Sequence, residues 1–177
     1  VASLYSPASR ALIPSIVPTE GLERYNSVYT GLSETSRAAG PGLLDACREL
    51  RRTTLADGLP TGEAVATDAF NLPCRWVIHT VGPVWFGGHR SEAVKLAEAY
   101  QNSLLLAQEH GIRSIAFPCI STGVYRFPAD LAAETALAIL KKTLPQCPSV
   151  EKIIFCCYSP QDAERYRALL ERDGAVV

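Results

Sequence analysis

The chain has 177 residues, of which 47% are hydrophobic, and its formal net charge is -1. That length and apolar content are enough for one domain with a substantial core. A near-neutral charge without a Lys/Arg cluster disfavours nonspecific binding to nucleic acid or to an anionic membrane, since both need a basic face. We therefore expect one domain over residues 1–177 and a small or neutral-surfaced ligand.

Two further features bear on where the protein works. The longest apolar runs, such as Ile153–Tyr158, are far shorter than the roughly 20 residues that cross a bilayer. Residues 1–10 lack the basic start and apolar stretch of a signal peptide. These patterns predict a cytoplasmic protein, or a nuclear one in a eukaryote, without a membrane partner, and nothing in them indicates an oligomeric state.

The cysteines and histidines do not form a metal-binding pattern. No C-x-x-C pair occurs, and the neighbours Cys156 and Cys157 would point to opposite faces of a strand. His79, His89 and His110 are scattered along the chain. We expect reduced thiols, no metal and no cofactor.

The N-terminal part of the chain shows the weakest pattern. Residues 1–35 contain several prolines and read as irregular, apart from a possible strand at Ala11–Val17. Pro41–Gly42 then precedes an expected helix that continues to Leu50, with apolar residues at helical spacing.

From about residue 63, strand and helix patterns alternate. Residues 63–70 alternate between apolar and polar, and Arg75–Val81 forms a second expected strand that ends at Gly82–Pro83. Ser91 is placed to cap a long helix, whose apolar residues recur at helical spacing until Gly111.

The same alternation continues to the end of the chain. Ser114–Phe117 is an expected buried strand, and Pro128 begins a helix that runs to about Leu144. Lys152–Tyr158 has the continuous apolar character of a strand covered on both faces. Ser159–Asp162 resembles a capping box before a last helix. This order predicts a three-layer α/β/α sandwich around a mostly parallel, mixed sheet.

The loop Ser121–Tyr125, with the sequence STGVY, follows one of these strands and leads to a helix. It offers successive backbone N–H groups, and its glycine allows a ligand to approach the main chain closely. Such a loop before a helix N-terminus suits a phosphate or diphosphate. An ordinary strand-to-helix turn, in which Ser and Thr form local hydrogen bonds, is the alternative.

Several motifs, in order, resemble the macrodomain family. Leu59–Trp85 resembles the family's segment with a T-G-E-A strand, an N-L-P turn and an I-H-T-V-G-P strand. Ile115–Pro128 resembles its second phosphate loop, Arg37–Leu44 the helix junction after its first loop, and Ile153–Tyr158 its last core strand. The resemblance covers roughly residues 36 to 172.

The resemblance implies that the ligand is ADP-ribose or an ADP-ribosylated protein. By carry-over, Ser121, Thr122, Gly123 and Val124 supply amides and hydroxyls to the diphosphate. Tyr125 would border the distal ribose. Tyr158 matches the family's aromatic position beside adenine, with a packing role as the alternative.

The chain departs from the pattern of hydrolytic macrodomains in the first loop. Those proteins carry A-I-V-N-A-A-N and G-G-G-V-D-G-A-I, whereas this chain has Ser15–Gly21 and Tyr29–Ser36, with Leu32 at the place of the aspartate. No catalytic residue is therefore assigned. Three readings remain open: a hydrolase of ADP-ribosyl or O-acetyl-ADP-ribose esters, a noncatalytic reader or binder of another nucleotide, and a generic α/β binding domain.

Overall fold

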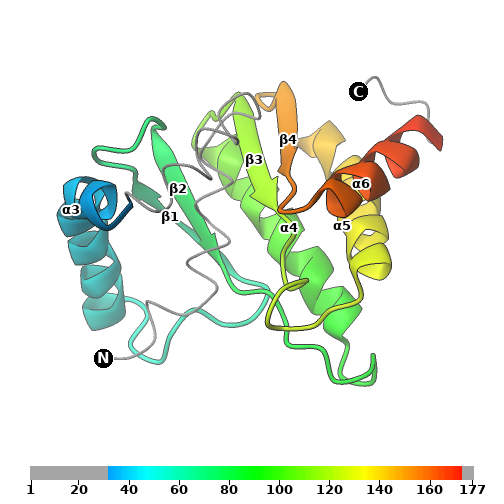
Figure 1. Cartoon of the computed structure of the whole chain (residues 1–177). Helices are drawn as coiled ribbons and strands as arrows, with labels where there is room; N and C mark the ends of the chain where they lie inside the picture. The colour runs from blue at the N-terminus through cyan, green and yellow to red at the C-terminus, as the bar shows by residue number, and fades with distance from the viewer. Residues whose placement is uncertain (1–31, 173–177) are drawn as a thin grey trace.

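A computed structural model describes residues 32–172 of the chain (Figure 1). The expected strand at Ala11–Val17, and most of the N-terminal segment predicted to be irregular, lie outside these described residues. The elements, in chain order, are α3 (Leu32–Thr53), β1 (Ala64–Asp68), β2 (Trp76–Thr80), α4 (Glu92–Glu109), β3 (Ser114–Pro118), α5 (Ala129–Thr143), the 3-10 helix η3 (Leu144–Gln146), β4 (Lys152–Cys156) and α6 (Pro160–Arg172).

The four described strands form two pairs. β1 and β2 are antiparallel, with Ala66 opposite Ile78, and β3 and β4 are parallel, with Ala116 opposite Ile154. Both parallel and antiparallel pairing occur, and within the described residues the two pairs are separate two-stranded sheets. The expected strand at Lys152–Tyr158 ends earlier, at Cys156, opposite Pro118. Pro118 has no N–H to donate, so the ladder stops there.

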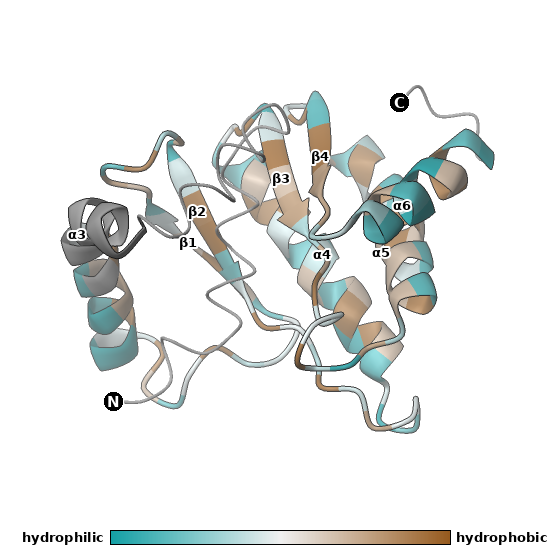
Figure 2. Ribbon diagram, in the orientation of Figure 1, coloured by the Kyte–Doolittle hydropathy of each residue, from teal (hydrophilic) through white to brown (hydrophobic). Residues whose placement is uncertain are grey.

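The hydrophobic core lies where α4 and α5 pack on β3. Its buried side chains include Leu96, Tyr100 and Leu104 of α4, Phe117 of β3, and Leu137 of α5. Figure 2 shows apolar residues along β3 and β4, whereas α6 presents a mostly hydrophilic surface. The apolar stripe on α4 that the sequence predicted is therefore packing surface and not a binding face.

Helix α3 is longer than the sequence suggested. It begins at Leu32, so the expectations that residues 32–35 are irregular and that the helix starts after Pro41–Gly42 were wrong. Pro41 removes one backbone donor, but the helix continues through it. Gly42 serves packing instead of ending a helix, because a Cβ added there would lie 2.6 Å from Cδ1 of Phe70.

The starts of the later helices test three sequence expectations. Ser91 is at the N-cap of α4 as expected, but its side chain makes no capping hydrogen bond. Ser159 does cap α6, since its Oγ accepts the N–H of Asp162 at 3.1 Å. Pro128 was expected to be the first helical residue of α5, but it is the N-cap, and the helix begins one position later, at Ala129.

Candidate functional site

The loop Ser121–Tyr125 lies at the carboxyl edge of the parallel strand pair. β3 ends at Pro118, and the chain then turns through this loop to α5. Tyr158 follows β4, and because β3 and β4 are parallel it lies near the same edge, with 89% of its surface exposed. Ligands of α/β proteins bind at this edge of a sheet.

The backbone of the loop is held in an unusual conformation. Ser121 has a φ of 67° and Arg126 a φ of 55°, in the left-handed region that non-glycine residues rarely adopt. Two hydrogen bonds fix the turn: Phe127 N–H donates to the Ser121 carbonyl at 3.0 Å, and Arg126 N–H donates to the Gly123 carbonyl at 2.9 Å. Such strain persists where the surrounding structure enforces it, and it is concentrated at functional sites.

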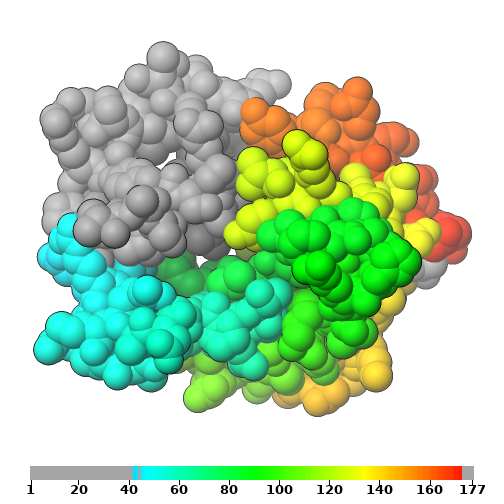
Figure 3. All heavy atoms as spheres, turned by 90° about the horizontal axis from the view of Figure 1, so that it is seen from below, coloured from blue at the N-terminus to red at the C-terminus, as the bar shows by residue number. Residues whose placement is uncertain are grey.

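Two residues from other elements anchor the loop. The hydroxyl of Tyr100 donates to the Pro118 carbonyl at 3.1 Å and accepts the N–H of Ile120 at 3.2 Å. Burial raises the pKa of Tyr100, so the hydroxyl keeps the proton that it donates. The N–H of Trp85 donates to the Tyr125 carbonyl at 2.9 Å. In the view from below, the segment after β2 and the segment before α5 lie side by side (Figure 3).

Gly82, just beyond β2, allows this loop to pack closely. A Cβ at that position would lie 2.2 Å from Oγ of Ser121 and 2.5 Å from Cγ2 of Ile120. The Ser121 hydroxyl itself is buried and has no hydrogen-bond partner among residues 32–172. A buried polar atom without a partner is rare, and it indicates a place where a bound molecule can satisfy it.

The backbone N–H groups of Gly123, Val124 and Tyr125 have no acceptor within the described part of the chain. Space beside the main chain is open at Gly123, since a Cβ there would meet no atom within 4 Å. The hydroxyl of Thr122, by contrast, donates to the Cys119 carbonyl at 2.9 Å and holds the loop. Three successive free amides form an array that can bind an anion.

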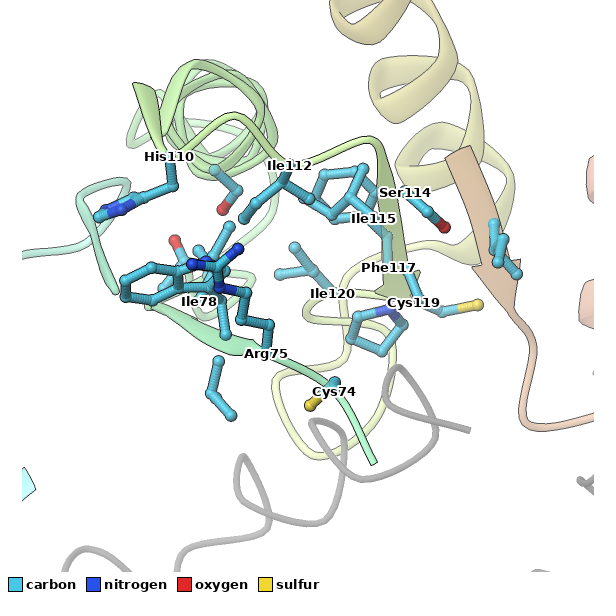
Figure 4. Close-up of a pocket in the computed structure, with 18 of the residues that line it drawn as sticks. Cys74, Arg75, Ile78, His110, Ile112, Ser114, Ile115, Phe117, Cys119 and Ile120 are labelled. Carbon is cyan, nitrogen blue, oxygen red and sulfur yellow. The ribbon is translucent and has the colours of Figure 1, made fainter. Parts of the chain in front are cut away.

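A cavity of about 560 Å³ lies beside the loop, between β2 and β3. Trp76 and Ile78 line it from β2, and Ile115 and Phe117 line it from β3. Ser121, Gly123, Val124 and Tyr125 contribute to the same cavity. The close-up shows the labelled side chains of the two strands around this space (Figure 4).

The rest of the described chain offers no competing metal centre. Among residues 32–172, no group of three His, Cys, Asp or Glu side chains is placed to hold a metal ion. His79 instead bonds the Thr67 hydroxyl at 2.9 Å, and burial lowers its pKa. No helix in the described range is long and apolar enough to span a membrane.

Sequence reasoning located the loop but missed the residues that support it. Tyr100 belonged to the apolar stripe of α4, and Gly82 was read as the end of a strand. A tyrosine in an otherwise aliphatic and alanine-rich stripe is the signal that could have identified the anchor, because a buried hydroxyl needs a partner. For Gly82 the sequence held no such signal.

Comparisons with known proteins identify the family of this chain. A family model described as "Macro domain" matches residues 33–136. A macro domain-containing protein of Chlorobaculum tepidum is 51% identical over 134 residues, which are 76% of this chain and 74% of the relative. A protein of Escherichia fergusonii named O-acetyl-ADP-ribose deacetylase is 50% identical over 138 residues, covering 78% of this chain and 77% of the relative.

Two solved structures show the same fold. The Oceanobacillus iheyensis macrodomain with ADP is 40% identical, with a TM-score of 0.71, and the match covers 77% of this chain and 72% of that one. The Trypanosoma brucei macrodomain in complex with ADP-ribose is 34% identical, with a TM-score of 0.66, over 76% of this chain and 54% of that one. The α/β sandwich expected from the sequence is thereby confirmed, and the chain belongs to the macro domain family.

Proposed function

We propose that this chain binds ADP-ribose, with the diphosphate on the backbone N–H groups of Gly123, Val124 and Tyr125. The observation that carries the proposal is that these amides have no acceptor in the described part of the chain, while their residues line the cavity and leave space open at Gly123. Oriented amides bind an anion without a lysine, which suits a chain of net charge -1. The solved relatives named with ADP and ADP-ribose support the choice of ligand.

The neighbouring residues take different parts in this proposal. Thr122 acts by shaping the loop, because its hydroxyl is already bonded to the Cys119 carbonyl. The Ser121 hydroxyl, which no described residue bonds, is available to a phosphate oxygen or a bound water. Tyr125 borders the distal ribose, and the exposed ring of Tyr158 stacks beside adenine, burying apolar surface that is now in solvent.

The proposed reaction is hydrolysis of an ester of ADP-ribose, such as O-acetyl-ADP-ribose. Water attacks the ester carbonyl, the bond to the ribose oxygen breaks, and acetate and ADP-ribose are released. The relatives named O-acetyl-ADP-ribose deacetylase, at about half identity, support this choice. The role of the described residues in this reaction is to hold the diphosphate, which positions the ester.

A noncatalytic reader of ADP-ribosylated protein is the second candidate. One observation favours it: Leu32 stands where hydrolytic macrodomains carry a loop aspartate, and leucine cannot orient or activate water. In this case the chain keeps its affinity for ADP-ribose and lacks turnover. Both candidates assume that residues 1–177 form a single macro domain, and the family match to residues 33–136 supports its central part.

Isothermal titration calorimetry with ADP-ribose tests the binding proposal, with adenosine as a control that lacks the diphosphate. We expect heat from ADP-ribose and much weaker binding of adenosine. Equal affinity for the two would show that the amide array contributes nothing. Release of acetate from O-acetyl-ADP-ribose, and of ADP-ribose from a mono-ADP-ribosylated protein, then separates the hydrolase from the reader.

A further inference from the structure

Two cysteines lie side by side at the base of the candidate phosphate loop. The last registered pair of β3 and β4 is Pro118 opposite Cys156, so Cys119 and Cys157 are the next residues on the two parallel chains. Neighbouring strands are about 4.8 Å apart, a spacing within the range that disulfides span between Cα atoms. The labelled thiol of Cys119 projects toward β4 in the close-up (Figure 4).

The two thiols also affect each other's ionisation. Their interaction raises the pKa of Cys119 and lowers the pKa of Cys157. The positive charges of Arg165 and Arg167 also lower the pKa of Cys157, while burial and Asp162 oppose them. Cys119 therefore keeps its proton, and Cys157 is the thiol that more readily becomes the nucleophilic thiolate.

Both side chains are partly exposed, so a small oxidant has access to them. All six cysteines lie in the described part of the chain, and none forms a disulfide there. The other four are not comparable, because burial raises the pKa of Cys47, Cys74, Cys147 and Cys156. Thiols with a raised pKa react slowly with oxidants.

The pair is also joined to both segments of the candidate site. Thr122 donates its hydroxyl to the Cys119 carbonyl, which ties Cys119 to the phosphate loop. Cys157 directly precedes Tyr158, the residue proposed to lie beside adenine. A disulfide between Cys119 and Cys157 therefore reaches both segments at once.

We propose that Cys119 and Cys157 are a modification site at which a peroxide forms a reversible disulfide, and that this disulfide weakens ligand binding at the adjoining loop. The Cys157 thiolate attacks one peroxide oxygen, the O–O bond breaks, and a sulfenic acid and water result once the leaving hydroxide takes up a proton. Cys119 then attacks the sulfenic sulfur and displaces hydroxide, which leaves as water with the Cys119 proton. In total, two thiols and one hydrogen peroxide give one disulfide and two waters.

Thiol counting tests the disulfide without reference to the ligand. The reduced chain is treated with hydrogen peroxide, unfolded and alkylated, and its peptides are analysed by mass spectrometry. We expect two of the six thiols to be lost, a Cys119–Cys157 linked peptide, and full recovery with dithiothreitol. If hydrogen peroxide has oxidised other thiols while Cys119 and Cys157 are still free to be alkylated, the proposal is overturned.

Single variants assign the roles. Cys119→Ser should leave Cys157 as a sulfenic acid that dimedone traps, and Cys157→Ser should leave Cys119 unreactive. Cys74→Ser is the matched control, since it also removes a half-buried cavity cysteine and should form the disulfide as the unsubstituted chain does. Disulfide formation in either Cys119→Ser or Cys157→Ser, or trapping on Cys119 in place of Cys157, would contradict the assignment.

The effect on binding rests on the proposed function and is measured separately. We expect the oxidised chain to bind ADP-ribose about tenfold more weakly than the reduced chain, a difference of about 1.4 kcal/mol. An unchanged affinity in a chain shown to carry the disulfide would refute the coupling. If the reduced chain binds no ADP-ribose, the proposed function fails while the thiol count still decides the disulfide.

Discussion

Within residues 32–172, the loops before α4 and α5 both present arrays of backbone N–H groups, but only the first array is occupied there. In the loop before α4, the carboxylate of Glu92 accepts the N–H groups of Phe86, Gly88 and Arg90 at 3.0, 3.1 and 2.6 Å. In the loop before α5, the N–H groups of Gly123, Val124 and Tyr125 have no acceptor in the described chain. The first loop carries its own anion, and the second is left open for an external one.

The comparison separates a structural turn from a ligand site. Glu92 is only 2% exposed, and it sits in the first turn of α4, where a negative charge is favoured by the helix dipole. Its carboxylate accepts the hydrogen bonds of the loop before α4, as a bound diphosphate would accept those of the loop before α5. The presence of an internal carboxylate thus distinguishes the two loops.

The largest expected effect comes from placing an anion in the open loop. Gly123→Glu should fill the space before the amides and repel the diphosphate, which lowers the affinity for ADP-ribose by more than about 100-fold, or roughly 2.7 kcal/mol. Gly123→Gln, similar in size but neutral, separates repulsion from filling and should lose less. Calorimetry measures both, and unchanged affinity in the glutamate variant would contradict the placement of the ligand.

Removing the anion from the occupied loop should affect stability instead of binding. Glu92→Gln weakens the bonds to buried amides, so we expect a melting temperature lower by several degrees at neutral pH. Glu109→Gln, on the exposed last turn of the same helix, is the matched control and should change little. A melting temperature equal to that of the unsubstituted chain would show that the loop holds without its carboxylate.

Glu92→Gln should also change how the stability of the chain depends on pH. Burial raises the pKa of Glu92, but hydrogen bonds from backbone N–H groups, including those of Arg90, Phe86 and Gly88, lower it by more. The net result is a lowered pKa of Glu92. Its contribution to stability is therefore complete above the pKa of the unfolded chain and is lost as the pH falls through the folded-state pKa. The difference in unfolding free energy between the unsubstituted chain and Glu92→Gln should shrink as the pH falls. A difference that grows as the pH falls would contradict a lowered pKa of Glu92.

A smaller effect is expected at the anchor of the open loop. Tyr100→Phe leaves the Ile120 N–H and the Pro118 carbonyl without their buried partner, at a cost of about 1–3 kcal/mol of unfolding free energy. ADP-ribose affinity should also fall, because the loop loses its fixed base. Chemical denaturation measures the first effect, with Tyr158→Phe as a control, since that hydroxyl belongs to an exposed side chain. Equal stability of Tyr100→Phe and the unsubstituted chain would remove Tyr100 as the anchor.

The smallest expected effect concerns catalysis. Leu32→Asp should raise ester hydrolysis by much less than the roughly 100-fold that a positioned general base supplies, because the asparagines of the hydrolytic pattern are absent as well. Turnover of O-acetyl-ADP-ribose is the measurement. A gain of that full size would show that a single aspartate is enough to restore a hydrolytic site.

The sequence predicted the parts of this molecule that depend on local pattern. The strands β1 to β4 and the helices α4 to α6 follow from apolar periodicity and from caps such as Ser159. The beginning of α3 was missed because Pro41 and Gly42 resemble a helix boundary, whereas Gly42 is there to accommodate the ring of Phe70. Local propensity cannot report a contact between residues so far apart in the chain.

The features of the candidate site also divide into those that local sequence predicts and those that depend on tertiary packing. The STGVY loop is contiguous, so its residues and its place after a strand could be read directly from the chain. The Tyr100 anchor, the close approach of Gly82, and the neighbouring thiols of Cys119 and Cys157 depend on strand register and helix packing. These were not predictable, because one sequence alone does not fix which residues of separate elements become neighbours.

A crystal structure of the chain with ADP-ribose tests the central claim most directly. We expect diphosphate oxygens at about 2.7–3.2 Å from the backbone nitrogens of Gly123, Val124 and Tyr125. A side chain of the protein bonded to those three amides, as Glu92 is bonded to the loop before α4, with the nucleotide bound elsewhere, would contradict it.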